Sequence, residues 1–137
     1  NVVGTVPSLG DRVLLCKRNI EPRKGKWTLP AGFMELGEST AEGAARETSE
    51  EAGAQFKIGS LFTVMSVPRV GQVHLYFLAE LENEQFDPGF ETQEARMFSE
   101  TEIPWDDLAF RTVQETLRHY FADKKSGSFG VHTLNID

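Results

Sequence analysis

The chain has 137 residues, of which 39% are hydrophobic, and a formal net charge of −7. This length suits one compact domain, residues 1–137, with a single core. The negative charge argues against a nucleic acid or an anionic membrane as partner, because both require clustered Lys and Arg.

The single cysteine, Cys16, excludes an internal disulfide and cannot form a zinc site by itself. It lies in an apolar run, so a buried thiol is expected. The sequence has no signal peptide and no run of about 18 apolar residues, which predicts a cytoplasmic location. Because the chain starts with Asn1 rather than Met, we expect that a segment before it has been removed.

Two strands, joined by a turn, are predicted at residues 1–7 and 12–18. The polar stretch 17–26 then holds five of the fourteen basic residues. Two interpretations of this stretch remain open. It is a solvated loop, or Arg18 and Arg23 contact the phosphates of a nucleotide, since no other part of the chain is locally basic.

A helix is predicted from about Thr40 to Ala52. Ser39 and Glu42 have the spacing of a capping box, in which each side chain satisfies a backbone amide at the helix start. Gly53 ends the helix, because glycine adopts the left-handed conformation without steric cost.

The helix has one side of small residues and one side of carboxylates. The small residues, expected to pack against a sheet, are Ala41, Ala45, Thr48 and Ala52. Glu47, Glu50 and Glu51 cluster on the other side, with Gly43 above them leaving room for a bulky group. Like charges at these spacings cost ~0.2–0.5 kcal/mol per pair, and a hard cation such as Mg²⁺ relieves the repulsion. The alternative is an ordinary solvated glutamate face.

The later elements follow from alternation, turn residues and helical spacing. Strands are predicted at 54–68, 71–81 and 95–98, a helix from about 108 to 123, and a weak last strand within 126–137. The histidines His74, His119 and His132 have no metal-ligand spacing and are interpreted as structural. Glu91 and Glu94 end an acidic loop. They are either solvated or able to swing over the first helix as a general base or metal ligand.

The stretch from Gly32 to Ala54 resembles the Nudix box, G-x5-E-x7-R-E-U-x-E-E-x-G-U, where U is aliphatic. Every charged and glycine position matches, whereas Thr48 replaces an aliphatic residue and the last position is only alanine. The stretches KRNIEPRKGKWTLPAGFMELGES and FDPGFETQEARMFSETEIPWDDLAF resemble the FAD and ADP-ribose pyrophosphatases of bacteria and plant chloroplasts. The resemblance implies an α/β/α sandwich with a central mixed sheet.

The resemblance also implies hydrolysis of a nucleoside diphosphate linked to a moiety X, such as FAD or ADP-ribose, into a nucleoside monophosphate and phospho-X. The implied ligands of Mg²⁺ or Mn²⁺ are Glu47, Glu50, Glu51 and the carbonyl of Ala31. Glu38 and Arg46 are implied to form an ion pair that orients Glu47. Gly32 shapes the substrate loop, and the general base is Glu50, Glu91 or Glu94.

Two further expectations follow from this resemblance. A short zinc ribbon often precedes the domain in this branch, and many relatives are homodimers, so a homodimer is predicted. Two other functions stay open. One is a nucleoside triphosphate pyrophosphohydrolase. The other is a nucleotide-sensing module without catalysis, although such modules usually lose glutamates of the box and this chain retains all of them.

Overall fold

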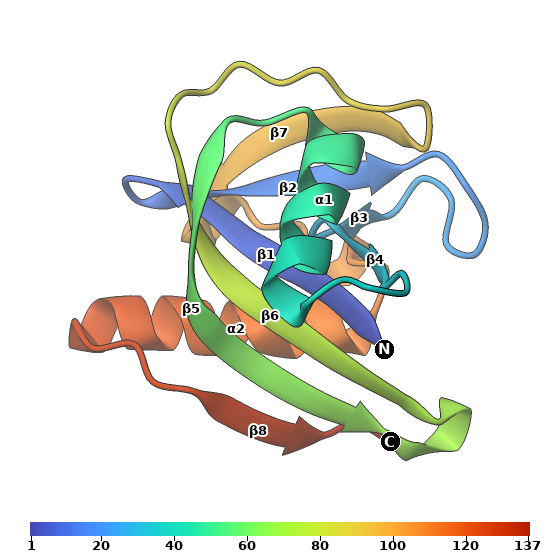
Figure 1. Ribbon diagram of the computed structural model, residues 1–137. Helices are drawn as coiled ribbons and strands as arrows, with labels where there is room; N and C mark the ends of the chain where they lie inside the picture. Colours follow the sequence, from blue (N-terminus) through green and yellow to red (C-terminus); the bar gives the residue numbers. More distant parts are fainter.

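The computed structural model describes all 137 residues, which form eight strands and two α-helices (Figure 1). The strands are β1 (Val2–Leu9), β2 (Arg12–Arg18), β3 (Trp27–Thr28), β4 (Ala31–Phe33), β5 (Phe56–Val67), β6 (Gln72–Leu81), β7 (Thr92–Ser99) and β8 (His132–Asn135). The helices are α1 (Thr40–Ala52) and α2 (Arg111–Ser126).

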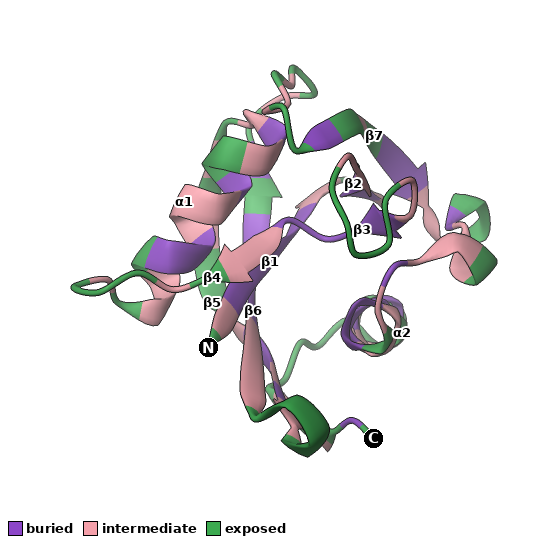
Figure 2. Cartoon of the chain, turned by 90° about the vertical axis from the view of Figure 1, so that its right-hand side faces the viewer, coloured by how far each residue is buried: buried purple, intermediate pink, exposed green.

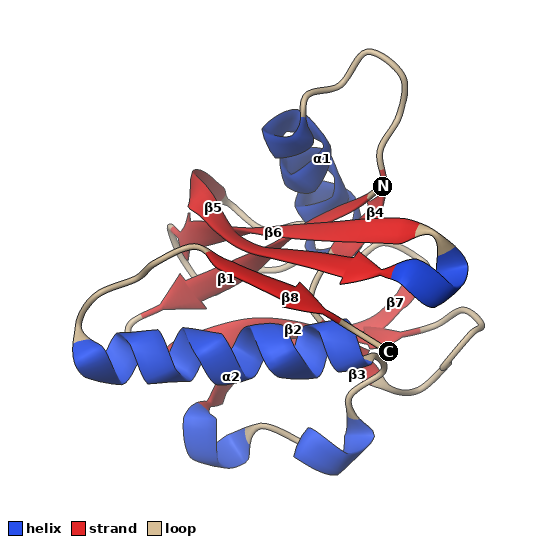
Figure 3. Cartoon of the chain, turned by 90° about the horizontal axis from the view of Figure 1, so that it is seen from below, coloured by secondary structure: helices blue, strands red, loops and turns tan.

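All eight strands belong to one mixed sheet. Its main path runs β3-β2-β1-β6-β5-β8, with β4 also paired to β1 and β7 to β2. The β1–β6 and β5–β8 pairs are parallel and the others are antiparallel. Figures 2 and 3 show α1 and α2 on opposite sides of the strands. The expected α/β class and central mixed sheet are therefore confirmed.

The larger part of the core lies between the sheet and α2. The side chains of α2 that enter it recur at helical spacing: Val113, Leu117, Tyr120 and Phe121. Phe62 of β5 packs edge-on against Tyr120, with ring centroids 6.2 Å apart. This confirms that the apolar stripe of the second helix is core.

Both ends of α1 form as predicted. The Ser39 hydroxyl accepts from the N–H of Glu42 at 3.1 Å, and the Glu42 carboxylate accepts from the N–H of Ser39 at 2.8 Å. Gly53 ends the helix with φ of 59° in the left-handed region. The helix that carries the carboxylates thus starts and stops where the sequence signals place it.

The packing face of α1 differs in part from the prediction. The buried residues are Gly43, Ala44, Thr48 and Ala52, whereas Ala41 and Ala45 are only partly buried. Gly43 leaves no room for a bulky group, because a Cβ there would lie 2.9 Å from a methyl carbon of Val3. Compared with the prediction, α1 is rotated about its axis, so that Gly43 rather than an alanine lies closest to β1.

Several element boundaries also differ. The short strands β3 and β4 were not expected, and β7 starts at Thr92 because it pairs along the whole of β2. The second helix begins at Arg111 rather than near residue 108, after a short 3-10 turn, Trp105–Asp107. The predicted last strand forms as β8, parallel to β5.

Cys16 is buried as expected, and burial raises the pKa of its thiol. His119 and His132 are adjacent, with ring centroids 4.3 Å apart, and His132 Nε2 lies 2.7 Å from Asp123 Oδ2. Neither helix is long and apolar enough to cross a membrane.

Candidate active site

Arg46 is the centre of a charged network where α1 meets the loop before it. Its Nε donates to Glu38 Oε2 at 2.5 Å, and its Nη2 donates to Glu38 Oε1 at 3.1 Å. Nη1 donates to Glu47 at 2.9 Å and to Glu50 at 2.7 Å, while Nη2 also reaches the carbonyl of Phe33 at 3.1 Å. The Arg46 hydrogen bond holds the pKa of Glu38 below its usual range. The expected Glu38–Arg46 pair is present and extends to two more carboxylates.

Gly32 of β4 is the point where the sheet and the carboxylates meet. A Cβ at this position would overlap the carboxylate of Glu47, whose side chain is 15% exposed. Only glycine therefore lets Glu47 lie directly against the strand. Its neighbour Ala31 brings the β4 backbone close to a second glutamate, Glu51.

Glu51 is the most buried carboxylate of α1. Burial raises its pKa, and a hydrogen bond with Glu47 and the charge of Glu47 raise it further. The backbone N–H of Ala31 and the charge of Arg18 act in the opposite direction. Burial and the neighbouring negative charge therefore both favour the protonated form of Glu51.

The carbonyl of Ala31 points away from β1. Backbone hydrogen bonds between β4 and β1 involve alternate residues. The N–H of Thr5 donates to the carbonyl of Pro30 at 3.1 Å, and the N–H of Met34 donates to the carbonyl of Asn1 at 3.0 Å. Ala31 and Phe33 alternate with these bonded positions, so their N–H and C=O groups point away from β1. The carbonyl of Phe33 does so and accepts from the arginine of α1.

The donor set fits a hard divalent cation. Glu47, Glu51 and the Ala31 carbonyl supply only oxygen atoms, which Mg²⁺ and Mn²⁺ prefer, and a cation there would offset the repulsion between the two carboxylates. No three acidic, His or Cys side chains are arranged as a complete metal site. Glu50 instead turns to Arg46, the cation one helical turn before it. Its side chain is 55% exposed, so it has room to rotate.

Glu91 and Glu94 form no hydrogen bond with the glutamates of α1. Glu94 lies on β7 and accepts from Arg96 Nε at 2.9 Å, while Glu91 is exposed. A different part of the loop reaches the helix: Asp87 N–H donates to the carbonyl of Ala52 at 3.0 Å. The loop thus contacts α1 through Asp87, and a role of Glu91 or Glu94 as general base or metal ligand stays a prediction.

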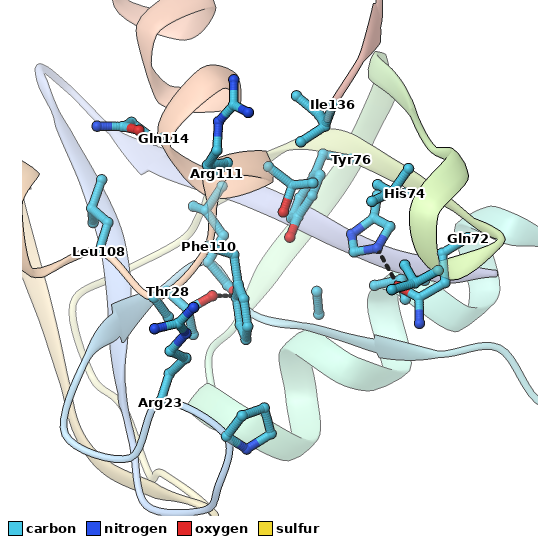
Figure 4. A pocket seen from close by; sticks show the side chains of 18 of the residues that line it. Arg23, Thr28, Gln72, His74, Tyr76, Leu108, Phe110, Arg111, Gln114 and Ile136 are labelled. Atoms are coloured by element: carbon cyan, nitrogen blue, oxygen red, sulfur yellow. Dashed lines mark hydrogen bonds between the residues drawn. The ribbon is translucent and has the colours of Figure 1, made fainter.

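A pocket of about 660 Å³ lies beside β4, between β6 and the start of α2. Residues 31–33 line it, so β4 is a wall shared with the carboxylates. Arg18 and Arg23 line it as well, which joins the basic loop to the site. The Arg18 guanidinium lies 5.0 Å from the centre of the Phe110 ring. In Figure 4, Phe110 and Arg23 stand across the pocket from His74, with Tyr76 behind.

The eight arginines of the chain divide into two groups. Four make ion pairs outside the pocket: Arg12, Arg46, Arg96 and Arg118. The other four make no ion pair and all line the pocket: Arg18, Arg23, Arg69 and Arg111. The sequence indicated Arg18 and Arg23 through their local basic cluster. It carried no such signal for Arg69 and Arg111, which come from two distant segments.

Comparison with known proteins gives a consistent family. The NUDIX domain model matches residues 1–122. The chain is 34% identical over 98 residues to an ADP-ribose pyrophosphatase of Methanocaldococcus jannaschii, covering 69% of this chain and 58% of that protein. It is 32% identical over 81 residues to an NAD-capped RNA hydrolase of Photobacterium profundum, covering 59% of this chain and 30% of that protein. The chain thus spans about half or less of these relatives.

The crystal structure of a NUDIX hydrolase from Nitrosomonas europaea superposes on the chain with a TM-score of 0.95 and 47% sequence identity. The match covers 98% of this chain and 77% of that one. The box of glutamates on α1, its arginine and the matching fold agree with the family model over most of the sequence. The chain belongs to the NUDIX domain family.

Proposed function

We propose that this chain hydrolyses the pyrophosphate bond of a nucleoside diphosphate linked to a moiety X, with FAD or ADP-ribose as the expected substrates. The products would be a nucleoside monophosphate and phospho-X, and the cofactor Mg²⁺ or Mn²⁺. The name of the Methanocaldococcus jannaschii relative supports ADP-ribose. A small nucleotide is preferred over RNA because the chain has a net charge of −7.

One observation carries this proposal: the four unpaired arginines share a pocket whose wall, β4, also contacts Glu47 and Glu51. A chain with excess negative charge that keeps four guanidinium groups without a carboxylate partner in one cavity is suited to a polyanion. A pyrophosphate bound there would form ion pairs with the arginines of the pocket and lie close to the carboxylates of α1.

The residues of the chain suggest how the reaction proceeds. A bound divalent cation supplies charge neutralisation and a more acidic water. Attack of a water oxygen on one phosphorus forms a P–O bond and breaks the bond from that phosphorus to the bridging oxygen, which leaves with the other phosphate. Arg46 holds Glu47 and Glu50 in place. The proton lost by water passes to a carboxylate.

Glu50 is the best placed of the proposed bases, because it lies on α1 together with Glu47 and Glu51, whereas Glu94 lies on β7 and binds Arg96. We expect Glu50→Gln to lower turnover by ~10²–10⁴, the usual contribution of general-base catalysis. Glu91→Gln and Glu94→Gln, assayed in parallel, are expected to retain most activity. Near-full turnover by Glu50→Gln, with loss in either of the others, would transfer the role to that residue.

The test of the function is release of AMP from FAD, ADP-ribose, NADH and dATP, with Mg²⁺, with Mn²⁺ and with chelator. We expect cleavage of FAD or ADP-ribose ahead of dATP, and none in chelator. Faster cleavage of dATP would favour a nucleoside triphosphate pyrophosphohydrolase. Binding of nucleotides without any cleavage would favour a sensing module.

The purified chain used in this assay also tests two further expectations. Activity of the isolated chain would show that residues 1–137 suffice as one domain, without a preceding zinc ribbon. Sedimentation equilibrium is expected to give a homodimer, twice the 15.3 kDa of the chain, and a mass of one chain would contradict it. A cytoplasmic location stays a prediction that cell fractionation would check.

A further inference from the structure

The pocket contains two buried polar atoms that have no hydrogen-bond partner. They are Nδ1 of His74 and Oγ1 of Thr112, and no other buried side-chain nitrogen or oxygen in the chain lacks a partner. Both residues line the same cavity. Burial without a hydrogen bond costs free energy, so native proteins rarely leave such atoms unpaired. Their coincidence in one pocket suggests that a ligand supplies the partners.

The hydrogen bond of His74 determines what its free nitrogen offers. His74 Nε2 lies 2.8 Å from Gln72 Oε1, drawn as a dashed line in Figure 4. Because a carbonyl oxygen can only accept, Nε2 carries the proton of this hydrogen bond. Burial lowers the pKa of His74, which favours the neutral ring. In that ring Nδ1 has a lone pair and acts as an acceptor.

Thr112 stands in the first turn of α2 and is 5% exposed. Phe110, the residue that caps this helix, offers no side-chain hydrogen bond. The Thr112 hydroxyl also faces the phenol of Tyr76: burial raises the pKa of Tyr76, and the interaction with Thr112 lowers it in part. The hydroxyl groups of Thr112 and Tyr76 therefore line the pocket together with the imidazole of His74.

The acceptor nitrogen of His74 does not suit a phosphate. Phosphate oxygens are acceptors at neutral pH, and two acceptors cannot hydrogen-bond to each other. The pocket already has arginines for negative charge. The acceptor of His74 requires an N–H or O–H, which a nucleotide carries on its base and its sugars.

We propose that His74 and Thr112 recognise the uncharged part of the nucleotide substrate, with His74 Nδ1 accepting a hydrogen bond from an N–H or O–H of a base or sugar. This inference rests on the proposed function only in taking the ligand to be a nucleotide. Neither atom touches water, so the ligand gains these contacts as neighbouring side chains shift, a common change on binding. Gln72 is a positioning residue that sets the tautomer of His74.

The test is equilibrium binding by calorimetry in chelator, where no hydrolysis occurs. The ligands are ADP-ribose, AMP and inorganic pyrophosphate. His74→Leu and Thr112→Val remove the polar atoms, whereas His74→Asn and Thr112→Ser keep a polar atom near the same position. We expect His74→Leu and Thr112→Val to weaken ADP-ribose binding about 10-fold each, the effect of one neutral hydrogen bond. The Asn and Ser variants should retain most of the affinity.

Binding of pyrophosphate is the matched control, because it presents only phosphate groups. It should not change in any of the four variants, and Arg23→Ala should weaken it. If AMP loses affinity together with ADP-ribose, the recognised donor lies in the adenosine half. If only ADP-ribose does, the donor lies in the moiety X. Both results support the proposal.

Two results would overturn it. One is unchanged binding of ADP-ribose by both His74→Leu and Thr112→Val. The other is an equal loss of pyrophosphate binding, which would indicate a structural role for the two residues. Failure of the proposed function looks different, since the wild-type chain would then release no AMP while the selective binding persists.

Discussion

At the scale of single residues, Arg46 connects the loop before α1 to three carboxylates and a backbone carbonyl. We expect Arg46→Ala to lower the free energy of unfolding by ~1.5–3 kcal/mol, because it removes hydrogen bonds between charged groups that are partly buried. Turnover should fall ~10–100-fold, as when residues that orient metal ligands are removed. Urea unfolding and steady-state kinetics measure the two effects.

The control is Arg12→Ala, which removes an exposed ion pair with Glu84. Exposed pairs contribute ~0–1 kcal/mol, and this one lies outside the site. If the two alanine variants lost similar stability and activity, the network around Arg46 would have no special role.

Gly32 is the second residue on which the site depends. In Gly32→Ala the new Cβ would force the Glu47 carboxylate away from β4. A displacement of about 1 Å in an active site costs on the order of 10²-fold in rate, so we expect a loss of that size with little loss of helix. Gly130→Ala is the matched control, since its Cβ would have no neighbour within 4 Å. Equal activity of the two variants would exclude close packing of Glu47 as a requirement.

Glu51 makes stability depend on pH when no metal is bound. Burial chiefly raises its pKa from 4.5 to about 9. A carboxyl group whose pKa is raised by folding contributes stability that is complete below its unfolded pKa. That stability is lost as pH rises through the folded value. In chelator, the free energy of unfolding should therefore fall between about pH 5 and pH 9 relative to Glu51→Gln.

Urea titrations of the two proteins across this pH range measure the difference. A divalent cation is expected to restore the stability of the wild-type chain at high pH, because it replaces the proton. Parallel pH profiles of the two proteins in chelator would show that Glu51 keeps its ordinary pKa.

At the scale of elements, α1 and β1 are joined by a buried pair of hydroxyls. Thr5 Oγ1 and Thr48 Oγ1 lie 2.7 Å apart, and Thr48 also donates to the carbonyl of Ala44 at 2.9 Å. This explains the departure from the Nudix box at Thr48, where the pattern has an aliphatic residue. The polar residue is compatible with the core because β1 supplies a partner.

We predict that Thr48→Val destabilises the protein by ~1–3 kcal/mol, because it leaves the hydroxyl of Thr5 buried without a partner. The double variant Thr5→Val with Thr48→Val should recover much of that loss. A double-mutant cycle of unfolding free energies measures the coupling. Additive effects of the two substitutions would show that the hydroxyls do not stabilise each other.

The loop between β6 and β7 shows that a local sequence pattern does not determine which residue of a loop contacts a distant helix. Its acidic composition predicted an irregular loop near α1, and Asp87 does hydrogen-bond to the end of that helix. Which residue makes the contact depends on the path of the chain. The path places Glu94 on β7 opposite Lys17 of β2. A strand pairing formed across 77 positions of sequence separation is invisible to local patterns.

At the scale of the whole molecule, β4 contacts both the acidic residues of α1 and the pocket lined by arginines. Glu47 of α1 lies against this strand, and the same strand lines the pocket that contains the arginines. The net charge of −7 is thus not spread evenly. All four arginines without an ion pair line the pocket, where an anionic ligand would gain most from their charge.

The sequence by itself determined the features that depend on near neighbours. The capping box, the glycine that ends α1 and the Glu38–Arg46 spacing act over at most eight residues, so the helix and its charged face could be predicted. Alternation likewise predicted the β5–β6 hairpin. These interactions need only backbone geometry and short side-chain reach.

The tertiary structure decided the features that depend on distant segments. It packed α1 against β1 at Gly43, and it brought Arg69 and Arg111 to the same pocket as Arg18. It also buried His74 and Thr112 without partners in that pocket. Each outcome results from packing between elements far apart in the chain. No local pattern encodes such packing, because its free energy belongs to the assembled core.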